Sequence, residues 1–159
     1  MGDIYKLITV TATTDAEQIN QNKVVAQSIE IPNAVRRKNG TAIIKSLILI
    51  DETNSTLECD VIFASANTAI TDDEGKAVGE DVADLDSTIN LFQGHISVAS
   101  ADYTDLVDTR LATKSNIDLM VQTAKDDSSL YMHIINRGSA VTFGETNDVK
   151  VRIGFLQGS

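Results

Sequence analysis

Residues 41–64, TAIIKSLILIDETNSTLECDVIFA, decide the fold class of this chain. The first ten are rich in β-branched and aliphatic side chains, which favour a β-strand. Turn-forming side chains follow in DETNS, residues 51–55. In the last eight, LECDVIFA, apolar positions recur at every second residue, as in a half-buried strand. They are Leu57, Cys59, Val61 and Phe63. The stretch therefore predicts two strands that form a hairpin with one face in the core.

Strand patterns continue on both sides of this hairpin. Before it, residues 4–12 and 23–31 read as strands, and Pro32 ends the second because proline has no ladder N–H. Asn39-Gly40 is a tight-turn dipeptide and a hairpin signal. After the hairpin, strand-like segments cover 95–99, 116–124, 129–136 and 149–157, and residues 101–106 read as a connection or a short strand. Turn-forming residues punctuate the series, as in antiparallel sheets.

One segment has a different period. In residues 81–94 the apolar positions recur at steps of three and four, which is one face of a helix. They are Val82, Leu85, Ile89 and Phe92. Asp81 suits the N-cap, and Gly94 suits the C-terminal end. The segment therefore predicts the one short helix of the chain.

About eight strands, one short helix and no regular alternation of strands with helices predict an all-β fold. Many short strands with turn signals favour an antiparallel β-sandwich that is jelly-roll-like, or else a barrel. The length of 159 residues suits a single domain, 1–159. The chain has four Phe, three Tyr and no Trp, so its core must consist mainly of Ile, Leu and Val.

The charge balance and the cysteine count exclude several classes of function. The net charge is −10, which disfavours a nucleic-acid partner because DNA affinity rests on basic contacts to phosphates. The one basic run, Arg36-Arg37-Lys38, adjoins the Asn-Gly turn and reads as a solvated loop tip. The longest apolar run, LILI at 47–50, is far too short to span a bilayer, so we expect no membrane partner. The single cysteine, Cys59, cannot form an internal disulfide, and its strand-like setting favours a buried apolar role.

The sequence shows no motif of catalytic or cofactor-binding residues. His95 and His133 are the two histidines, and each lies in an apolar strand pattern, where a satisfied structural role is the simpler interpretation. A catalytic triad needs three groups in contact, which one sequence leaves open. No nucleophile elbow, phosphate-binding glycine loop or helical zinc-binding histidine pair is present. We therefore expect neither an enzyme nor a cofactor.

The most acidic segment is TDDEGKAVGED, residues 71–81. Its consecutive acids and the position of Gly75 do not match the alternating ligands of a helix–loop–helix calcium site. An irregular calcium site that uses Asp73, Glu80 and backbone carbonyls stays open. The simpler interpretation is a solvated acidic loop whose end caps the following helix. We therefore expect no metal centre.

Six phrases occur in an order that extends over nearly the whole chain: YKLITVTATTD, IEIPNAVRRKNGTAIIKSLILID, CDVIFASANTAITDDEGKAVGEDVADL, GHISVASADYTDL, SLYMHIINRGSAVTF and VKVRIGFLQ. In this order the chain resembles small virion structural proteins of tailed bacteriophages, in particular those that decorate or cement the capsid. The resemblance implies a jelly-roll-like β-sandwich on the outer capsid surface of the virion. It also implies the major capsid protein as partner, and a homotrimer, since similar proteins often form trimers at symmetry points of the shell.

A cement protein needs a rigid scaffold and a contact surface, and no active site. Apolar and aromatic residues near loops and termini often anchor such surfaces. The interface candidates on this ground are Tyr103, Phe143, Phe155 and Leu156, with an ordinary core position as the alternative for each. The N-terminal MGDIYK is a candidate arm along the capsid. The alternative function is another virion component, such as a head-fibre base, a tail protein or a host-surface binding module.

Overall fold

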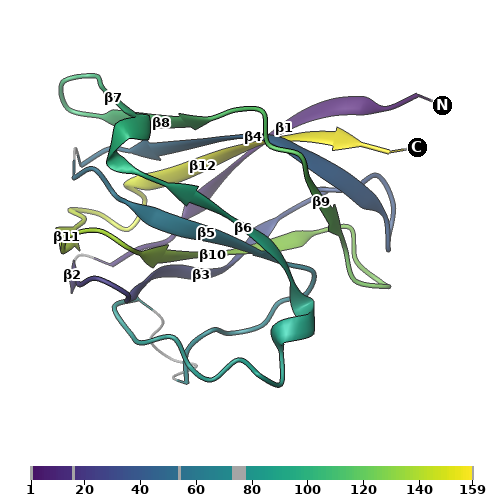
Figure 1. Cartoon of the computed structure of the whole chain (residues 1–159), viewed down its shortest axis with the longest axis horizontal. Coiled ribbons are helices and arrows are strands. Elements are labelled where there is room, and N and C mark those ends of the chain that lie inside the picture. Colours follow the sequence, from purple (N-terminus) through teal and green to yellow (C-terminus); the bar gives the residue numbers. More distant parts are fainter. Residues whose placement is uncertain (1, 16, 54, 73–77, 159) are drawn as a thin grey trace.

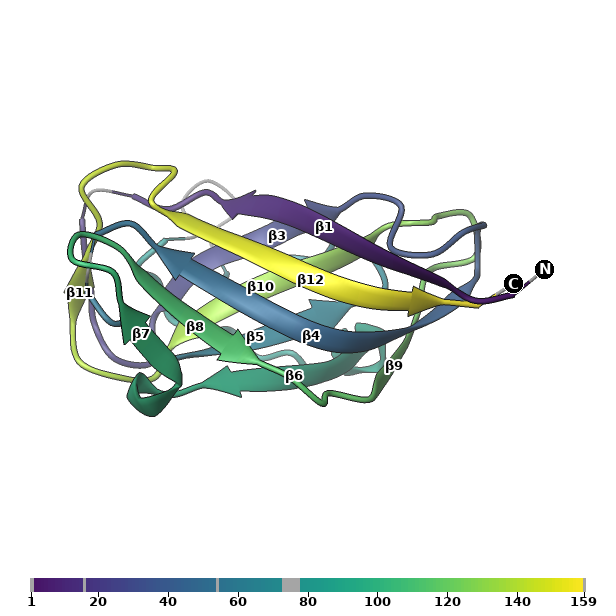
Figure 2. The same cartoon turned by 90° about the horizontal axis from the view of Figure 1, so that it is seen from above.

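The computed structural model describes residues 2–15, 17–53, 55–72 and 78–158. These residues form two main antiparallel β-sheets packed face to face and a small two-stranded sheet, with the chain termini together at one end (Figure 1, Figure 2). The strands are β1 (Ile4–Ala12), β2 (Gln18–Ile19), β3 (Val24–Ile31), β4 (Thr41–Asp51), β5 (Cys59–Ala64), β6 (Phe92–Val98), β7 (Tyr103–Asp105), β8 (Arg110–Lys114), β9 (Leu119–Gln122), β10 (Leu130–Asn136), β11 (Val141–Thr142) and β12 (Val149–Gln157). The helical elements are two 3-10 turns, η1 (Ile89–Leu91) and η2 (Ser100–Asp102). Neither of them, nor any other part of the described chain, has the length and hydropathy of a membrane-spanning helix.

The order of the strands identifies a jelly roll. Sheet I has the order β1-β12-β4-β8-β7, and sheet II has the order β3-β10-β5-β6. Strands β8 and β9 pair with successive halves of β4, so together they take one position in sheet I. Apart from the short edge strand β7, each layer thus has four strand positions, and the chain changes sheet after β1, β3, β4, β6, β9 and β10. This crossing pattern is that of a double-sheet jelly roll. The predicted all-β, antiparallel, jelly-roll-like sandwich is confirmed.

The core lies between the two sheets and follows the alternation read from the sequence. On β12 the inward positions are completely buried: Val149, Val151, Ile153 and Phe155. Lys150 and Arg152, between them, are half-buried on the outer face. Burial of side chains from both sheets in one cluster supplies the main stabilising term of the fold, about 1.5–3 kcal/mol for each large apolar side chain.

The hairpin predicted over residues 41–64 is wrong. Strand β4 pairs with β12, β8 and β9 in sheet I, whereas β5 pairs with β10 and β6 in sheet II. The intervening residues cross from one sheet to the other, and the Asn39-Gly40 turn likewise connects β3 of sheet II to β4 of sheet I. The alternation of apolar residues shows which face of a strand is buried, but it does not show which strand is the hydrogen-bonded neighbour. Two strands with apolar faces can pair in one sheet, or they can face each other across the core from opposite sheets.

The crossing after β4 is organised by a buried carboxylate. Asp51 is completely buried, although it is charged. Its Oδ1 accepts hydrogen bonds from the backbone N–H of Thr53 at 2.9 Å and the hydroxyl of Thr53 at 2.7 Å. Its Oδ2 accepts a hydrogen bond from the hydroxyl of Ser55 at 2.7 Å. The turn-forming residues recognised in the sequence therefore serve a crossing between sheets.

The helix predicted over residues 81–94 does not form. Only η1 is helical in that segment, and β6 already begins at Phe92. Asp84 Oδ1 accepts a hydrogen bond from the backbone N–H of Asp86 at 3.0 Å, and this local bond competes with helix formation. Val82, Leu85 and Phe92 instead pack against a small second core on the outer face of sheet II.

This second core forms because the described part of residues 65–91, the covering segment, lies over the outer face of sheet II (Figure 1). A β-bulge in β3, where Gln27 and Ser28 face one residue of β10, anchors the segment. Gln27 Oε1 accepts a hydrogen bond from the backbone N–H of Ile70 at 3.0 Å. The Ser28 hydroxyl donates to the carbonyl of Thr68 at 3.1 Å. A β-bulge thus connects the sheet to its cover.

Substitution of Gly94 by alanine is expected to lower the free energy of unfolding by about 2 kcal/mol, since φ is +145° and side chains at such angles are strained. The added Cβ would also lie 2.8 Å from Leu119 Cδ1. Chemical denaturation of Gly94→Ala and of Gly158→Ala checks this. Gly158→Ala is the control, because a Cβ at that position would have its nearest atom, the carbonyl oxygen of Thr41, at 3.9 Å. This substitution should change the free energy of unfolding little. Equal stability of the two variants would contradict the prediction.

Candidate functional site

An apolar row crosses the outer face of sheet I near the chain termini. The strand registers place Tyr5 of β1 beside Leu156 of β12, Leu156 beside Ile43 of β4, and Ile43 beside Met120 of β9. The side chains of Leu156, Ile43 and Met120 lie on the solvent side of the sheet, because their neighbours along each strand are buried or packed against the core. Tyr5 lies on the same side, because it is an odd number of positions from the buried Ile8 of its own strand. Tyr5 is 76% exposed and Met120 is 67% exposed, whereas Leu156 and Ile43 between them are half-buried.

Hollows accompany this row. One of about 370 Å³ is lined by Tyr5, Leu7 and Lys45 around Gly154. Gly154 has no room for a side chain, because a Cβ there would contact the hydroxyl of Ser46. A smaller hollow of about 110 Å³ lies between Leu156, Ile43 and Met120. The face therefore has protruding apolar side chains at both edges and depressions between them.

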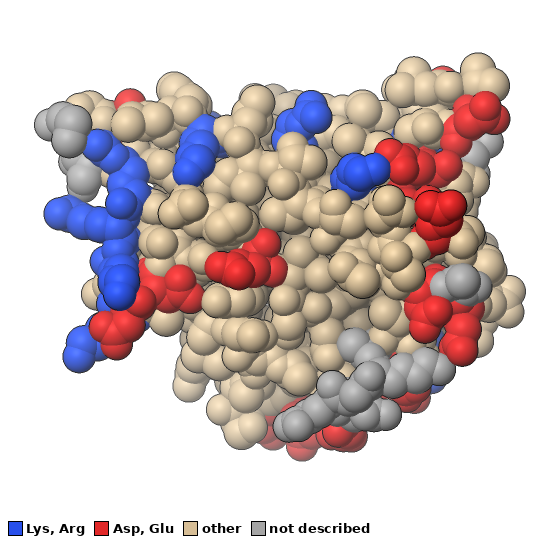
Figure 3. All heavy atoms as spheres, turned by 180° about the vertical axis from the view of Figure 1, so that it is seen from behind, with Lys and Arg blue, Asp and Glu red and all other residues tan. Residues whose placement is uncertain are grey.

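Charges of both signs surround the row. Lys45 forms an ion pair with Asp118, and the hydrogen bond with that carboxylate raises the pKa of Lys45. Lys6 donates to the carbonyl of Asn33 at 3.1 Å, and Arg152 donates to the Thr9 hydroxyl at 3.2 Å. On the face seen in Figure 3, Lys and Arg gather toward the end with the termini, and many Asp and Glu lie toward the opposite end.

The structure does not bring the four predicted interface residues together on one surface. Phe143 and Phe155 are completely buried, so they are core residues of the single chain. Tyr103 is half-buried, and its hydroxyl donates to the carbonyl of Leu57 at 2.6 Å. Leu156 alone belongs to the apolar row. Tyr5, Ile43 and Met120 were not among the interface residues predicted from the sequence. They are neighbours only through the register of their strands, which no local sequence pattern reveals.

A third hollow lies on the outer face of sheet II. It measures about 360 Å³, and its walls are apolar side chains of β5, the covering segment and β6: Ile62, Leu85, Ile89 and Phe92. Asp60, His95 and Arg137 line it with polar groups. Arg137 donates to Asp60 at 2.8 Å and to the side-chain oxygen of Asn22 at 2.9 Å. The arrangement can accept an apolar group with a polar end.

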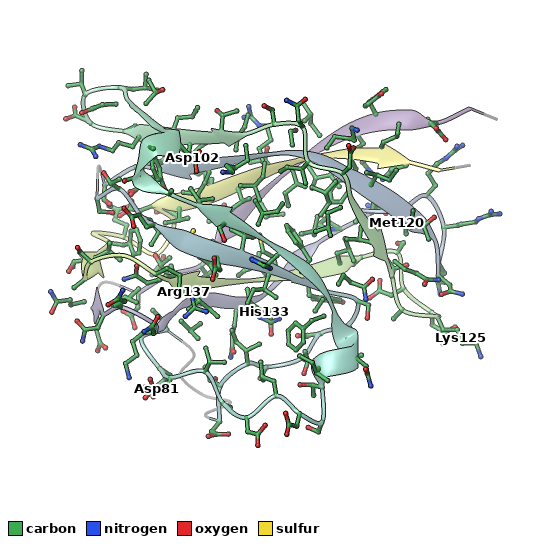
Figure 4. The ribbon with its side chains drawn as sticks, viewed as in Figure 1. Asp81, Asp102, Met120, Lys125, His133 and Arg137 are labelled. Carbon is green, nitrogen blue, oxygen red and sulfur yellow. The ribbon has the colours of Figure 1, made fainter. Side chains whose placement is uncertain are left out.

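His133 is completely buried on β10, beneath the covering segment (Figure 4). Its Nδ1 accepts a hydrogen bond from the backbone N–H of Ser28 at 3.0 Å, so the neutral ring carries its proton on Nε2. Nε2 has no partner within the described residues, and the ring meets Phe92 edge-on at 6.0 Å. Burial lowers the pKa of His133 to about 4. His133 therefore has the expected backbone partner at Nδ1, but the expectation of a fully satisfied ring is not met at Nε2.

These groups do not form an activated nucleophile in the described part of the chain. His133 bonds the backbone of Ser28, while the hydroxyl of Ser28 bonds the carbonyl of Thr68. His95 lies across Ile62 from His133 on the same sheet. Cys59 is buried, and this burial raises the pKa of its thiol, which keeps the thiol protonated and unreactive.

The acidic segment 71–81 is only partly described. Asp73 and Gly75 lie outside the described residues, so the irregular calcium site that would include Asp73 remains a hypothesis. At the far end of the segment, the carbonyl of Glu80 accepts the backbone N–H of Val24 at 2.9 Å, and Asp81 pairs with Lys23 at 2.7 Å. Among described residues no group of three His, Cys, Asp or Glu side chains is placed to hold a metal ion.

Comparisons with known proteins give similar structures but no similar sequences. No protein-family model and no curated protein matches the chain. The capsid of Ralstonia phage GP4 is 16% identical, with a TM-score of 0.42 over 99% of this chain and 85% of that one. A Sacbrood virus of honeybee protein, in expansion state I, is 13% identical, with a TM-score of 0.31 over 98% and 83%. A chain of the T13 IBDV viral particle is 10% identical, with a TM-score of 0.36 over 99% of this chain and 32% of that one.

Proposed function

We propose that this chain is a virion structural protein that decorates the outer surface of a phage capsid and stabilises it by binding the major capsid protein. It acts as a homotrimer and performs no catalysis. The single domain, 1–159, serves as a rigid module whose exposed faces make the contacts.

The observation that carries this proposal is the jelly-roll order of the strands. Jelly rolls form the domains of viral capsids, and also lectins and cupins. A cupin-like metal site would need a cluster of ligands, and the described residues contain none. The order of sequence phrases that resembles phage decoration proteins then favours the capsid role over the other uses of this fold.

A second candidate is another virion component: a head-fibre base, a tail protein or a host-surface binding module. The hollow on sheet II favours a binding module, because its volume of about 360 Å³ lies in the range of small-ligand sites. Asp60, His95 and Arg137 would orient a ligand whose apolar part contacts Ile62 and Phe92.

Rebinding to stripped particles tests the first function against the second. Particles of the virus that carries this chain would be stripped of it and titrated with the purified protein. We expect saturable binding at a fixed ratio to the major capsid protein, and a higher temperature of capsid disruption, because a ligand of the assembled state stabilises that state. An acidic protein of equal size serves as control. Failure to rebind, together with binding to host cells, would favour the second candidate.

A further inference from the structure

We infer that the outer face of sheet I is the surface through which copies of this chain contact one another, with the Tyr5 edge of one copy against the Met120 edge of the next. The number of copies, three, rests on the proposed function. The surface itself rests only on the structure.

The two edges of the row are the most exposed parts of it. At the end of sheet I near the termini, β1 and β9 are the outermost strands, and they carry Tyr5 and Met120. Met120 lies at this end, whereas Asp102 and Arg137 lie toward the opposite one (Figure 4). A large exposed aromatic ring and an exposed thioether are suited to contact each other, since sulfur–aromatic contacts are favourable. Large exposed apolar side chains in one row are typical of an interface.

The charge of the chain favours this face for contact between identical copies. A net charge of −10 makes copies repel each other over most of their surface. Around the row the charges are mixed, with Lys45 and Arg152 on the face and Asp118 paired to Lys45. Leu7, also 68% exposed, extends the apolar area. Asp3 also lines the smaller hollow, so a contact here buries apolar side chains among charges of both signs.

The size and profile of the face suit three copies around an axis parallel to the strands. Four strands at about 4.8 Å spacing make a face about 19 Å wide, and three such faces enclose an axis at about 5.5 Å from each. That distance is close to half of the ~10 Å separation at which sheets pack through their side chains. In this ring the contacts lie at the edges, where Tyr5 and Met120 protrude, and the depressions beside Gly154 and Ile43 lie inward.

A paired cysteine variant tests the contact directly. The double variant Tyr5→Cys, Met120→Cys has one new thiol on β1 and one on β9, which lie three strand positions apart in sheet I. The two Cα atoms of one chain are therefore about 14 Å apart, which is too far for a disulfide within that chain. We expect mild oxidation to give covalent trimers on a non-reducing gel. The wild type, whose one thiol, Cys59, is buried, should give none. Only monomers from the double variant would overturn the inferred contact.

The mass of the protein in solution provides the second readout. Light scattering should show a trimer for the wild type and a monomer for Met120→Lys, which adds a charge to the exposed edge of the row. The matched control is Ile89→Lys, because Ile89 is 57% exposed in η1, beside the outer face of sheet II. It should stay trimeric, and circular dichroism checks that both variants fold. If the wild type is a stable dimer and the cysteine variant still cross-links, the inferred contact surface is supported and the inferred number of three copies is wrong.

Failure of the inference and failure of the proposed function give different results. If the wild type is monomeric at all concentrations and Met120→Lys loses binding to stripped particles, this face docks on the capsid and self-association is overturned. If the chain is a cross-linkable trimer that does not bind particles, the surface is right and the decoration role is wrong. If Ile89→Lys dissociates the oligomer and Met120→Lys does not, the contact between copies lies on the side of sheet II and the inference is overturned.

Discussion

The free energy of unfolding is expected to fall by about 3 kcal/mol between pH 7 and pH 4 because of His133 alone. Burial lowers its pKa to about 4 in the folded chain, against about 6.5 for a solvent-exposed histidine. The unfolded chain therefore binds a proton first as the pH falls. The stability linked to neutral His133 is fully present above pH 6.5 and is lost as the pH falls toward 4.

The surroundings of His133 explain why the folded chain resists this proton. Nδ1 accepts the N–H of Ser28, so protonation there would place two donors against each other. The facing groups are Phe92 from the edge of β6, Ile62 from β5 and the bulge of β3, and none of them is charged. The same bulge holds the covering segment through Ser28 and Gln27. Acid is thus expected to loosen this segment first, which hydrogen exchange of the Ile70 amide measures.

The variant His133→Asn isolates the effect. The asparagine oxygen can accept the Ser28 N–H in place of Nδ1, but it does not titrate. The variant should unfold more easily at pH 7, and its stability should depend less on pH between 6.5 and 4. Other acids contribute equally in both proteins: hydrogen bonds from the backbone hold the pKa of Asp102 and of Asp127 low, and their stabilisation is also lost as the pH falls.

His95→Asn is the matched control, since His95 is exposed on the same sheet. It should keep the part of the pH dependence that is due to His133. Denaturant titrations at several pH values compare the three proteins. A pH dependence of His133→Asn as steep as that of the wild type would show that another group is responsible.

The second large effect is expected at Asp51. Replacement by alanine should lower the free energy of unfolding by about 3 kcal/mol, because hydrogen bonds to a charged acceptor are among the stronger ones and their donors would lose a partner. Those donors are the N–H and hydroxyl of Thr53 and the hydroxyl of Ser55. The crossing from sheet I to sheet II would lose its organising group.

Two further variants make this prediction specific. Asp51→Asn keeps an oxygen for Thr53 and should cost clearly less than alanine. Glu52→Ala removes only an ion pair with Lys150 that is partly exposed on both sides, and such pairs contribute at most about 1 kcal/mol. Thermal unfolding of all three variants checks the order. An Asp51→Ala protein as stable as Glu52→Ala would show that the buried carboxylate does not organise the crossing.

Local sequence patterns located most of the sheet. The segments read as strands at 4–12 and 149–157 coincide with β1 and β12, because alternation with a period of two is a property of each strand alone. The period of three and four in residues 81–94 was misleading, since an extended segment lying over a sheet also buries apolar residues at uneven steps. The hydrogen bond that the Asp84 side chain accepts from the backbone N–H of Asp86 favoured the non-helical conformation.

The candidate surface was less accessible to prediction. Phe143 and Phe155 were chosen as aromatic residues near loops and termini, yet both are completely buried. Nothing local separates an inward aromatic residue near a loop from an outward one, because that depends on which strands lie above it. Leu156 lies half-buried on the outer face of sheet I, and its role as an interface residue stays a prediction.

The sequence by itself determined the all-β class, the positions of the long strands and the apolar face of each, since these depend on residues within a few positions of one another. Tertiary structure alone decided that β4 and β5 lie in opposite sheets and that Tyr5, Leu156, Ile43 and Met120 form one row. The physical reason is that backbone hydrogen bonds between strands join residues far apart in the chain. Register, unlike alternation, exists only when the partner strand is in place.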